Sequence, residues 1–145
     1  MEQPTLPASV SEPVAIRVLL IQNGVTDRGF LTDKLSKQGF AVRKIASLAG
    51  APDAARDADV IVLQCELAKN SIDLLVKLHH QGVNVPVVLL TGEAAPAHEC
   101  LALDQGAIDV ILKSRGPEVL VRRLKSAVKA SRRAPMEWLM LRLES

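Results

Sequence analysis

The chain has few aromatic residues, few cysteines and no long apolar segment. Only 2% of its 145 residues are aromatic, and tyrosine is absent. This composition favours an aliphatic core between helices and a parallel sheet over an aromatic-rich all-β sandwich. Two cysteines, Cys65 and Cys100, are too few for a disulfide framework, and no secretory leader is visible. The longest apolar runs fall far short of the roughly 20 residues that a transmembrane helix needs. We therefore expect a cytoplasmic protein without membrane insertion.

The chain also lacks an excess of charge of one sign. Its formal net charge is +2, so no global field points to nucleic acid or to a membrane surface as partner. The exception is segment 115–133, which carries seven basic side chains and a single acid, Glu118. Such a segment is either a solvated helix face or an interaction surface. The candidate interaction residues in it are Arg122, Arg123, Lys125 and Lys129.

Short apolar runs alternate with stretches of helical periodicity. Strands are predicted over residues 16–21, 40–46, 59–63 and 86–90, with a fifth that ends at Leu112. Between them, helices are predicted from an N-cap at Thr26 to Gln38 and over residues 48–58, 71–81 and 97–105. A fifth helix starts at Gly116-Pro117 and ends near Ser131. Five strands that alternate with five helices describe a doubly wound α/β fold.

In the first predicted helix, Phe30, Leu31 and Leu35 are expected on one helical face. Gly39 ends this helix, as glycine commonly does.

The two ends of the chain differ from this pattern. Residues 1–15 are proline-rich and aperiodic, and we interpret them as a disordered leader before a domain at 16–131. Arg132-Arg133-Ala134-Pro135 should interrupt the last helix, after which residues 136–145 look helical again. Trp138 and Leu139 belong to a wide apolar arc there, so 132–145 is a helical extension or a linker to a missing domain. Packing of this arc back onto its own domain is the alternative.

Polar residues stand where four of the apolar runs end. Gln22 and Asn23 follow the first run, Gln64 follows the third, Thr91 the fourth and Lys113 the fifth. Carboxyl ends of parallel strands share one edge of the sheet, where doubly wound folds place their sites. The five side chains should therefore gather at this edge.

The order and spacing of these residues resemble the receiver domain of response regulators, over roughly residues 16–131. Receivers have an acidic pair after strand 1, a phospho-acceptor Asp after strand 3, Ser or Thr after strand 4 and Lys after strand 5. Gly106-Ala107, six residues before Lys113, strengthens the resemblance. It implies a five-stranded parallel sheet of order 2-1-3-4-5 with five helices, the flavodoxin- or CheY-like fold.

Every carboxylate of the receiver site is replaced here. Gln22 and Asn23 stand at the metal-ligand positions and Gln64 stands at the acceptor position. An amide nitrogen is not a useful nucleophile, and neutral amides give Mg²⁺ no charge compensation. We therefore expect no catalytic residue, no metal and no cofactor. Lys113, without acidic neighbours, could hydrogen-bond Gln64 or Asn23.

The residues of the receiver's conformational readout also depart from the family pattern. Ser114 replaces the usual proline after the lysine, and Val110 stands at the aromatic switch position. With no aromatic ring to change rotamer, the usual readout is not expected.

The sequence hypothesis is a degenerate pseudo-receiver, a signal-transduction module that acts by protein–protein contact without phosphorylation. The resemblance implies dimerisation or partner docking through the predicted helix at 97–105, the strand that ends at Leu112 and the helix that starts at Gly116-Pro117. The partner would be a second copy, an output domain or another signalling protein. A homodimer would form through the fifth predicted helix and residues 132–145. Nucleic acid is not the expected partner, because no DNA-binding motif is present. Two alternatives stay open: a sensor of an anionic metabolite or nucleotide, and, ranked last, an enzyme on a flavodoxin-like fold.

Other candidate residues rank lower. A thiol nucleophile at Cys65 should point away from Gln64, because side chains alternate along a strand. Adjacent His79 and His80 diverge on a helix and cannot chelate a metal as an i, i+4 pair would. His98 is isolated, and no glycine-rich nucleotide-binding motif follows a strand.

Overall fold

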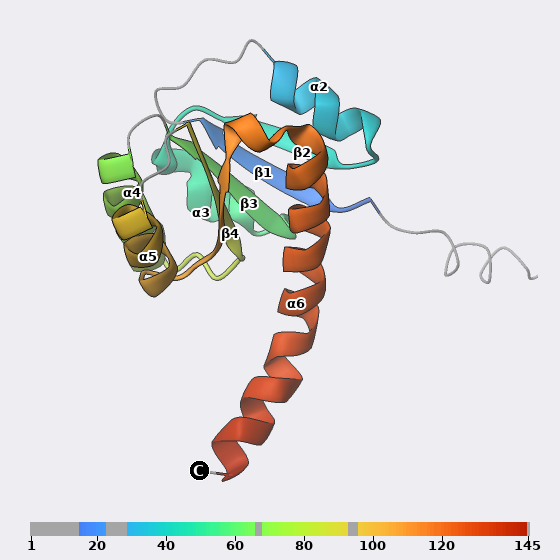
Figure 1. Cartoon of the computed structure of the whole chain (residues 1–145). Coiled ribbons are helices and arrows are strands. Elements are labelled where there is room, and N and C mark those ends of the chain that lie inside the picture. Colours follow the sequence, from blue (N-terminus) through green and yellow to red (C-terminus); the bar gives the residue numbers. More distant parts are fainter. Residues whose placement is uncertain (1–14, 23–28, 66–67, 93–95, 145) are drawn as a thin grey trace, which may run out of the picture.

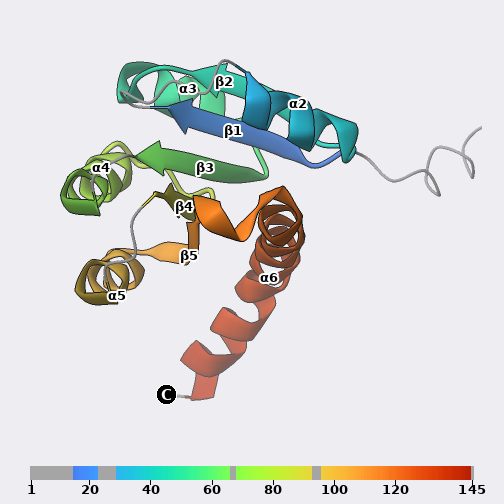
Figure 2. The same ribbon diagram turned by 45° about the horizontal axis from the view of Figure 1, so that its top comes forward.

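The computed structural model describes residues 15–22, 29–65, 68–92 and 96–144. Five strands and their connecting helices form three layers, with the sheet in the middle (Figures 1 and 2). The strands are β1 (Arg17–Gln22), β2 (Ala41–Ile45), β3 (Val60–Cys65), β4 (Val87–Thr91) and β5 (Ala107–Leu112). The helices are α2 (Phe30–Lys37), α3 (Ala51–Ala55), α4 (Ala68–His80), α5 (Pro96–Asp104) and α6 (Pro117–Glu144), with 3₁₀ turns η1 (Leu48–Gly50) and η2 (Lys113–Arg115).

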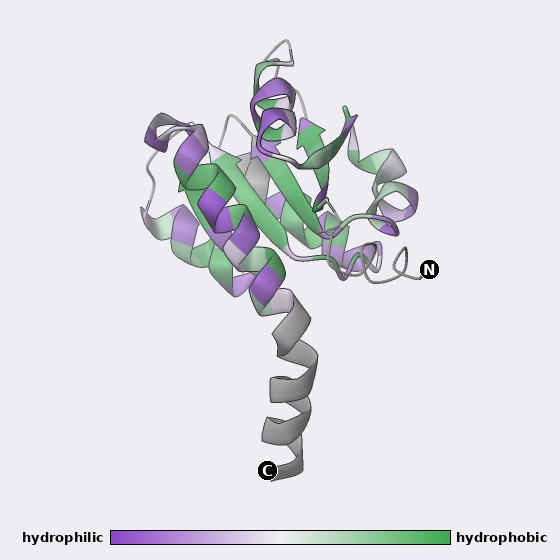
Figure 3. Cartoon of the chain, turned by 90° about the vertical axis from the view of Figure 1, so that its right-hand side faces the viewer, coloured by the Kyte–Doolittle hydropathy of each residue, from purple (hydrophilic) through white to green (hydrophobic). Residues whose placement is uncertain are grey.

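All pairings in the sheet are parallel, in the order β2-β1-β3-β4-β5, which confirms the expected fold. Helices α3, α4 and α5 cover one face, and α2 and α6 cover the other. Successive strand residues point to opposite faces, so Leu19 and Ile21 enter one core while Val18 and Leu20 enter the other. Burial on both sides explains why the central strands read as continuous apolar runs. Figure 3 shows hydrophobic strands surrounded by helices of mixed character.

The start of α2 differs from the sequence prediction. The helix begins at Phe30, preceded by Gly29 with a φ of 82°, rather than after Thr26, which lies outside the described residues. Phe30 is 60% exposed, whereas Leu31 and Leu35 are buried. Phe30 therefore lies outside the buried stripe of the helical face on which the sequence grouped all three residues. Adjacent helical residues are about 100° apart, and the buried stripe follows the i, i+4 pair.

The last helix also differs from the prediction. α6 runs without interruption from Pro117 to Glu144, through Pro135, and extends beyond the body of the domain (Figure 1). A proline removes one backbone hydrogen bond and disfavours the preceding turn, but its fixed φ is compatible with a helix. The predicted break at 132–135 was therefore wrong, while the assignment of 132–145 as a separate functional extension stays a prediction. Despite the 28 residues of α6, none of the described helices is both long and apolar enough to span a bilayer.

Other element boundaries also differ from the predicted ones, two of them near the candidate site. β3 continues through Cys65, two residues further than predicted, so Gln64 lies inside the strand. α4 begins at Ala68, three residues before the predicted start.

Gly106 joins α5 to β5 with a φ of 104°, a conformation that a side chain disfavours. Apart from Gly106 and its two chain neighbours, no described residue has an atom within 4 Å of the Cβ position at Gly106, so any cost of Gly106→Ala arises from the backbone alone. We expect this substitution to lower the free energy of unfolding by about 1–2 kcal/mol. Gly50→Ala is the matched control, because Gly50 also faces open space but has a φ of −92°. Urea denaturation should show that only Gly106→Ala is destabilising; equal effects would contradict the strain argument.

Candidate functional site

Gln22 and Gln64 form a buried amide pair at the carboxyl edge of the sheet. They are register partners on the adjacent strands β1 and β3. The Nε2 of Gln22 donates a hydrogen bond to the Oε1 of Gln64 at 3.0 Å. Gln64 is only 2% exposed and Gln22 is 8% exposed. The two amides therefore bond to each other at the carboxyl ends of two adjacent central strands. Asn23 lies outside the described residues.

Thr91 and Lys113 occupy the ends of the next two strands. Thr91 is the last residue of β4 and is buried, level in register with Cys65 on β3 and Leu112 on β5. Lys113 follows β5 directly, at the start of η2, and is exposed. Within the described part of the chain, the Gln64 oxygen is bonded by Gln22 rather than by Lys113. The edge thus brings together Gln22, Gln64, Thr91 and Lys113, as the strand ends indicated.

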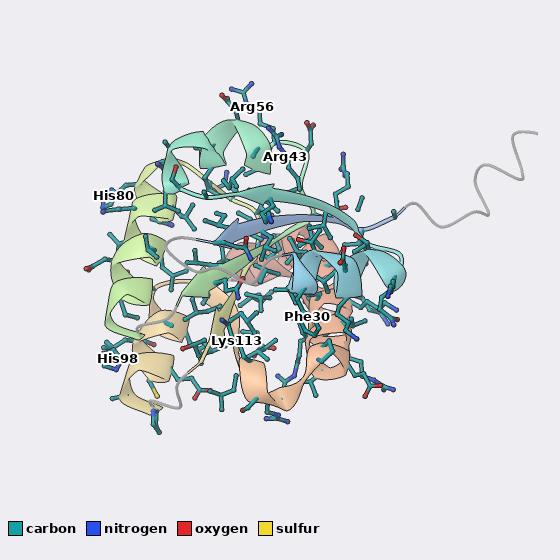
Figure 4. The ribbon with its side chains drawn as sticks, turned by 90° about the horizontal axis from the view of Figure 1, so that it is seen from above. Phe30, Arg43, Arg56, His80, His98 and Lys113 are labelled. Atoms are coloured by element: carbon teal, nitrogen blue, oxygen red, sulfur yellow. The ribbon has the colours of Figure 1, made fainter. Side chains whose placement is uncertain are left out.

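A pocket of about 140 Å³ opens beside this edge, between α2, the ends of β3 and β4, and the start of α6. Figure 4 shows the molecule from above and labels Phe30 and Lys113, which both line the pocket. Sequence reasoning could not give the lining or the size of this pocket, because both depend on how far apart two helices dock on one sheet face. Its lining residues are Phe30, Leu31, Gln64, Leu90, Lys113, Gly116, Pro117 and Leu120.

The described residues contain no cluster of three or more His, Cys, Asp or Glu side chains that could hold a metal ion. His79 and His80 lie exposed at the end of α4, and Figure 4 shows His80 and His98 remote from Lys113. Within the described site, hydrogen bonding and the charge of Lys113 are the available chemistry.

The candidate basic residues of α6 do not share one surface. Arg123 turns toward β5, where its Nη1 lies 2.9 Å from the Oδ2 of Asp109. Arg122 and Lys125 instead line a groove between α2 and α6, together with Lys34. Lys129 is exposed further along the helix. The side chains of Trp138 and Leu139 lie outside the described part of the structure.

Three large apolar side chains on α5 and β5 are exposed, which sequence reasoning also missed. Leu101, Leu103 and Ile108 are between 38% and 48% exposed. Ile108 is adjacent in sequence to Asp109, the partner of Arg123. An amphipathic pattern could not have identified these side chains, because leucine in a helix next to a sheet is normally buried.

The amide pair makes a specific stability prediction. Gln22→Met should remove the donor and leave the buried Gln64 oxygen without its partner, at a cost of about 1–3 kcal/mol. The double variant Gln22→Met, Gln64→Met removes both polar groups at similar volume, and we expect it to be nearly as stable as the unchanged chain. Urea denaturation of the two single variants and the double variant measures the coupling. Additive losses would contradict a direct Gln22–Gln64 bond.

Comparison with known proteins places this geometry in context. No protein-family model matches the chain. The chain is 28% identical, over 94% of its length, to the alkaline phosphatase synthesis transcriptional regulatory protein SphR of Synechococcus elongatus. It is 29% identical, over 86% of its length, to the DNA-binding response regulator MtrA of Mycobacterium tuberculosis. The chain spans only 58% and 56% of these two regulators.

Solved structures of response regulators are similar to this chain in fold. HP1043, an orphan response regulator of H. pylori, superposes with a TM-score of 0.62 at 25% identity, covering 78% of this chain and 96% of that one. An atypical orphan response regulator, described as revealing a phosphorylation-independent regulatory mechanism, superposes with a TM-score of 0.63 at 23% identity. It covers 79% of this chain and 96% of its own. Fold and sequence together support a response-regulator receiver domain, a signal-transduction module, and these relatives are regulators rather than enzymes.

Proposed function

We propose that this receiver domain works without phosphorylation and signals through protein–protein contact. The observation that carries the proposal is the Gln22–Gln64 hydrogen bond at 3.0 Å. It joins two neutral amides, which by the resemblance stand at the metal and acceptor positions of a receiver. Aspartyl phosphorylation requires a carboxylate nucleophile and a hard cation held by carboxylates. Neither group is available from Gln22 and Gln64. The phosphorylation-independent mechanism ascribed to one structural neighbour supports this interpretation.

The surface of α5, β5 and α6 is the proposed contact region. It combines the exposed side chains of Leu101 and Ile108 with the charged pair Asp109–Arg123. Exposed apolar side chains beside charged ones are typical of a protein interface. A second copy is the proposed partner, with the 132–145 extension as the helix that couples the module to an output domain. The greater length of SphR and MtrA supports a place for such a domain.

The phosphorylation part is tested by incubating the chain with acetyl phosphate and Mg²⁺ and measuring its intact mass. We expect no phosphoryl adduct, whereas a receiver with an intact acidic site, treated in parallel, should be labelled. An acyl phosphate on this chain would sink the proposal.

The contact part is tested by light scattering coupled to size exclusion across a range of concentrations. We expect a dimer that the double variant Leu101→Glu, Ile108→Glu converts to monomer, because charge in a desolvated contact is costly. Lys77→Glu, an exposed site on α4, is the control and should leave the dimer intact. A version that ends at Arg133 reports on the extension. A monomer at every concentration would argue against self-association.

A further inference from the structure

The pocket beside the amide pair differs in chemistry from a phosphoryl site. Of the eight described residues that line it, five are apolar: Phe30, Leu31, Leu90, Pro117 and Leu120. Gln64 and Lys113 are its polar members, and Gly116 completes the lining. We propose that this pocket binds a small monoanion with an apolar body, such as an aromatic or short aliphatic carboxylate. This inference goes beyond the proposed function, which concerns contacts with protein partners.

The volume of the pocket limits the size of the ligand. About 140 Å³ is close to the roughly 150 Å³ of an engineered apolar cavity that accepts benzene. Pockets for drug-sized ligands occupy about 300–1,000 Å³. The pocket therefore encloses a body of about one ring or one short alkyl chain, and a nucleotide would extend out of it into solvent.

The walls of the pocket favour an apolar body. Leu31, Leu90 and Leu120 are buried, so they present packed aliphatic surface rather than mobile side chains. Phe30 contributes a ring at the side of α2 and is largely open to solvent. A ligand seated against Phe30 would cover apolar area that water now contacts, which is favourable by about 25 cal/mol per Å².

The charge of the pocket favours an anion. Among the described residues of the lining, Lys113 alone is charged, and it is exposed, so its ammonium can reach a ligand at the rim. Carboxylates at positions 22 and 64 would repel an anion unless a metal ion intervened. Their replacement by amides removes this repulsion. The bond from Gln22 holds the Gln64 amide in place, so the polar end of the pocket is already organised before a ligand enters.

The experiment is an NMR titration of the ¹⁵N-labelled full chain with benzoate at constant ionic strength. We expect saturable shifts in the amides around the pocket, those of Leu31, Leu90, Gly116 and Leu120. Benzyl alcohol has the ring without the charge and should bind about fivefold more weakly than benzoate. Inorganic phosphate has the charge without the ring and should leave these amides unmoved. Benzoate shifts that are confined to the basic residues of α6, or not saturable, would overturn the proposal.

Two variants separate the contribution of the Lys113 charge to ligand affinity from that of the apolar wall. Lys113→Gln removes the ammonium at an exposed position and should weaken benzoate binding about fivefold, with no effect on benzyl alcohol. Phe30→Ala should weaken both probes. Lys77→Gln on α4, exposed and remote from the pocket, is the matched control and should change neither. Benzoate affinity that is indifferent to Lys113→Gln would overturn the anion assignment. Because these readouts involve neither phosphorylation nor assembly, their failure is distinguishable from failure of the proposed function.

Discussion

A variant carrying Gln22→Asp, Asn23→Asp and Gln64→Asp is expected to accept a phosphoryl group from acetyl phosphate with Mg²⁺, which the unchanged chain should not do. The restored pair would hold the metal, and the new carboxylate on β3 would attack phosphorus as acetate leaves. Thr91 and Lys113 already stand at the other two positions. The sheet that aligns these positions is present, so the missing element is negatively charged oxygen rather than geometry.

The matched control for this variant keeps the metal ligands and removes only the nucleophile. Gln22→Asp and Asn23→Asp are combined with Gln64→Asn, which should bind Mg²⁺ but take up no phosphoryl group. Intact mass gives the labelling, and circular dichroism confirms that both variants are folded. A folded, Mg²⁺-binding triple variant that stays unlabelled would show that Gln64 is not at the acceptor position.

Restoring the carboxylates should also lower stability when Mg²⁺ is absent. Gln64 is 2% exposed, and a carboxylate there would lose hydration and face two further carboxylates. We expect a loss of about 2–4 kcal/mol in the free energy of unfolding at neutral pH. Millimolar Mg²⁺ should recover part of it, because a ligand that binds only the folded state stabilises that state.

Leu124→Ala should produce a large loss of stability, about 2–5 kcal/mol. Leu124 is 0% exposed and lies in the core between α6 and the sheet, with Leu20, Val62 and Leu120 in the same cluster. Truncation removes buried methyl groups and leaves a cavity that the surrounding sheet and helix cannot fully close.

Lys125→Ala is the control for this truncation. Lys125 is the next residue of the same helix but is exposed, so its replacement should change stability by no more than about 0.5 kcal/mol. Urea denaturation followed by circular dichroism compares the two variants. A loss below about 1 kcal/mol for Leu124→Ala would mean that α6 is not docked on the sheet as described.

The sequence by itself determined the element order, the class of the fold and the missing carboxylates. Runs such as Val18–Ile21 and Val60–Leu63 are apolar at every position, because strands of a covered parallel sheet are buried on both faces. Polar residues at the ends of such runs must meet at one edge, so the order of the runs alone groups Gln22, Gln64, Thr91 and Lys113. The loss of acidic chemistry is a matter of residue type and does not depend on how the chain packs.

Only the tertiary structure decided how these residues bond and what surrounds them. The Gln22–Gln64 hydrogen bond depends on the register between β1 and β3, which no local pattern specifies. The exposure of Phe30 depends on where α2 begins and how it rotates against the sheet. Neighbouring helical residues point about 100° apart, so Arg122 and Arg123 diverge in any helix. Only the docking of α6 decides that Arg123 meets Asp109 while Arg122 faces α2. Each of these facts arises from contacts between segments distant in sequence, and these are set when the elements pack together.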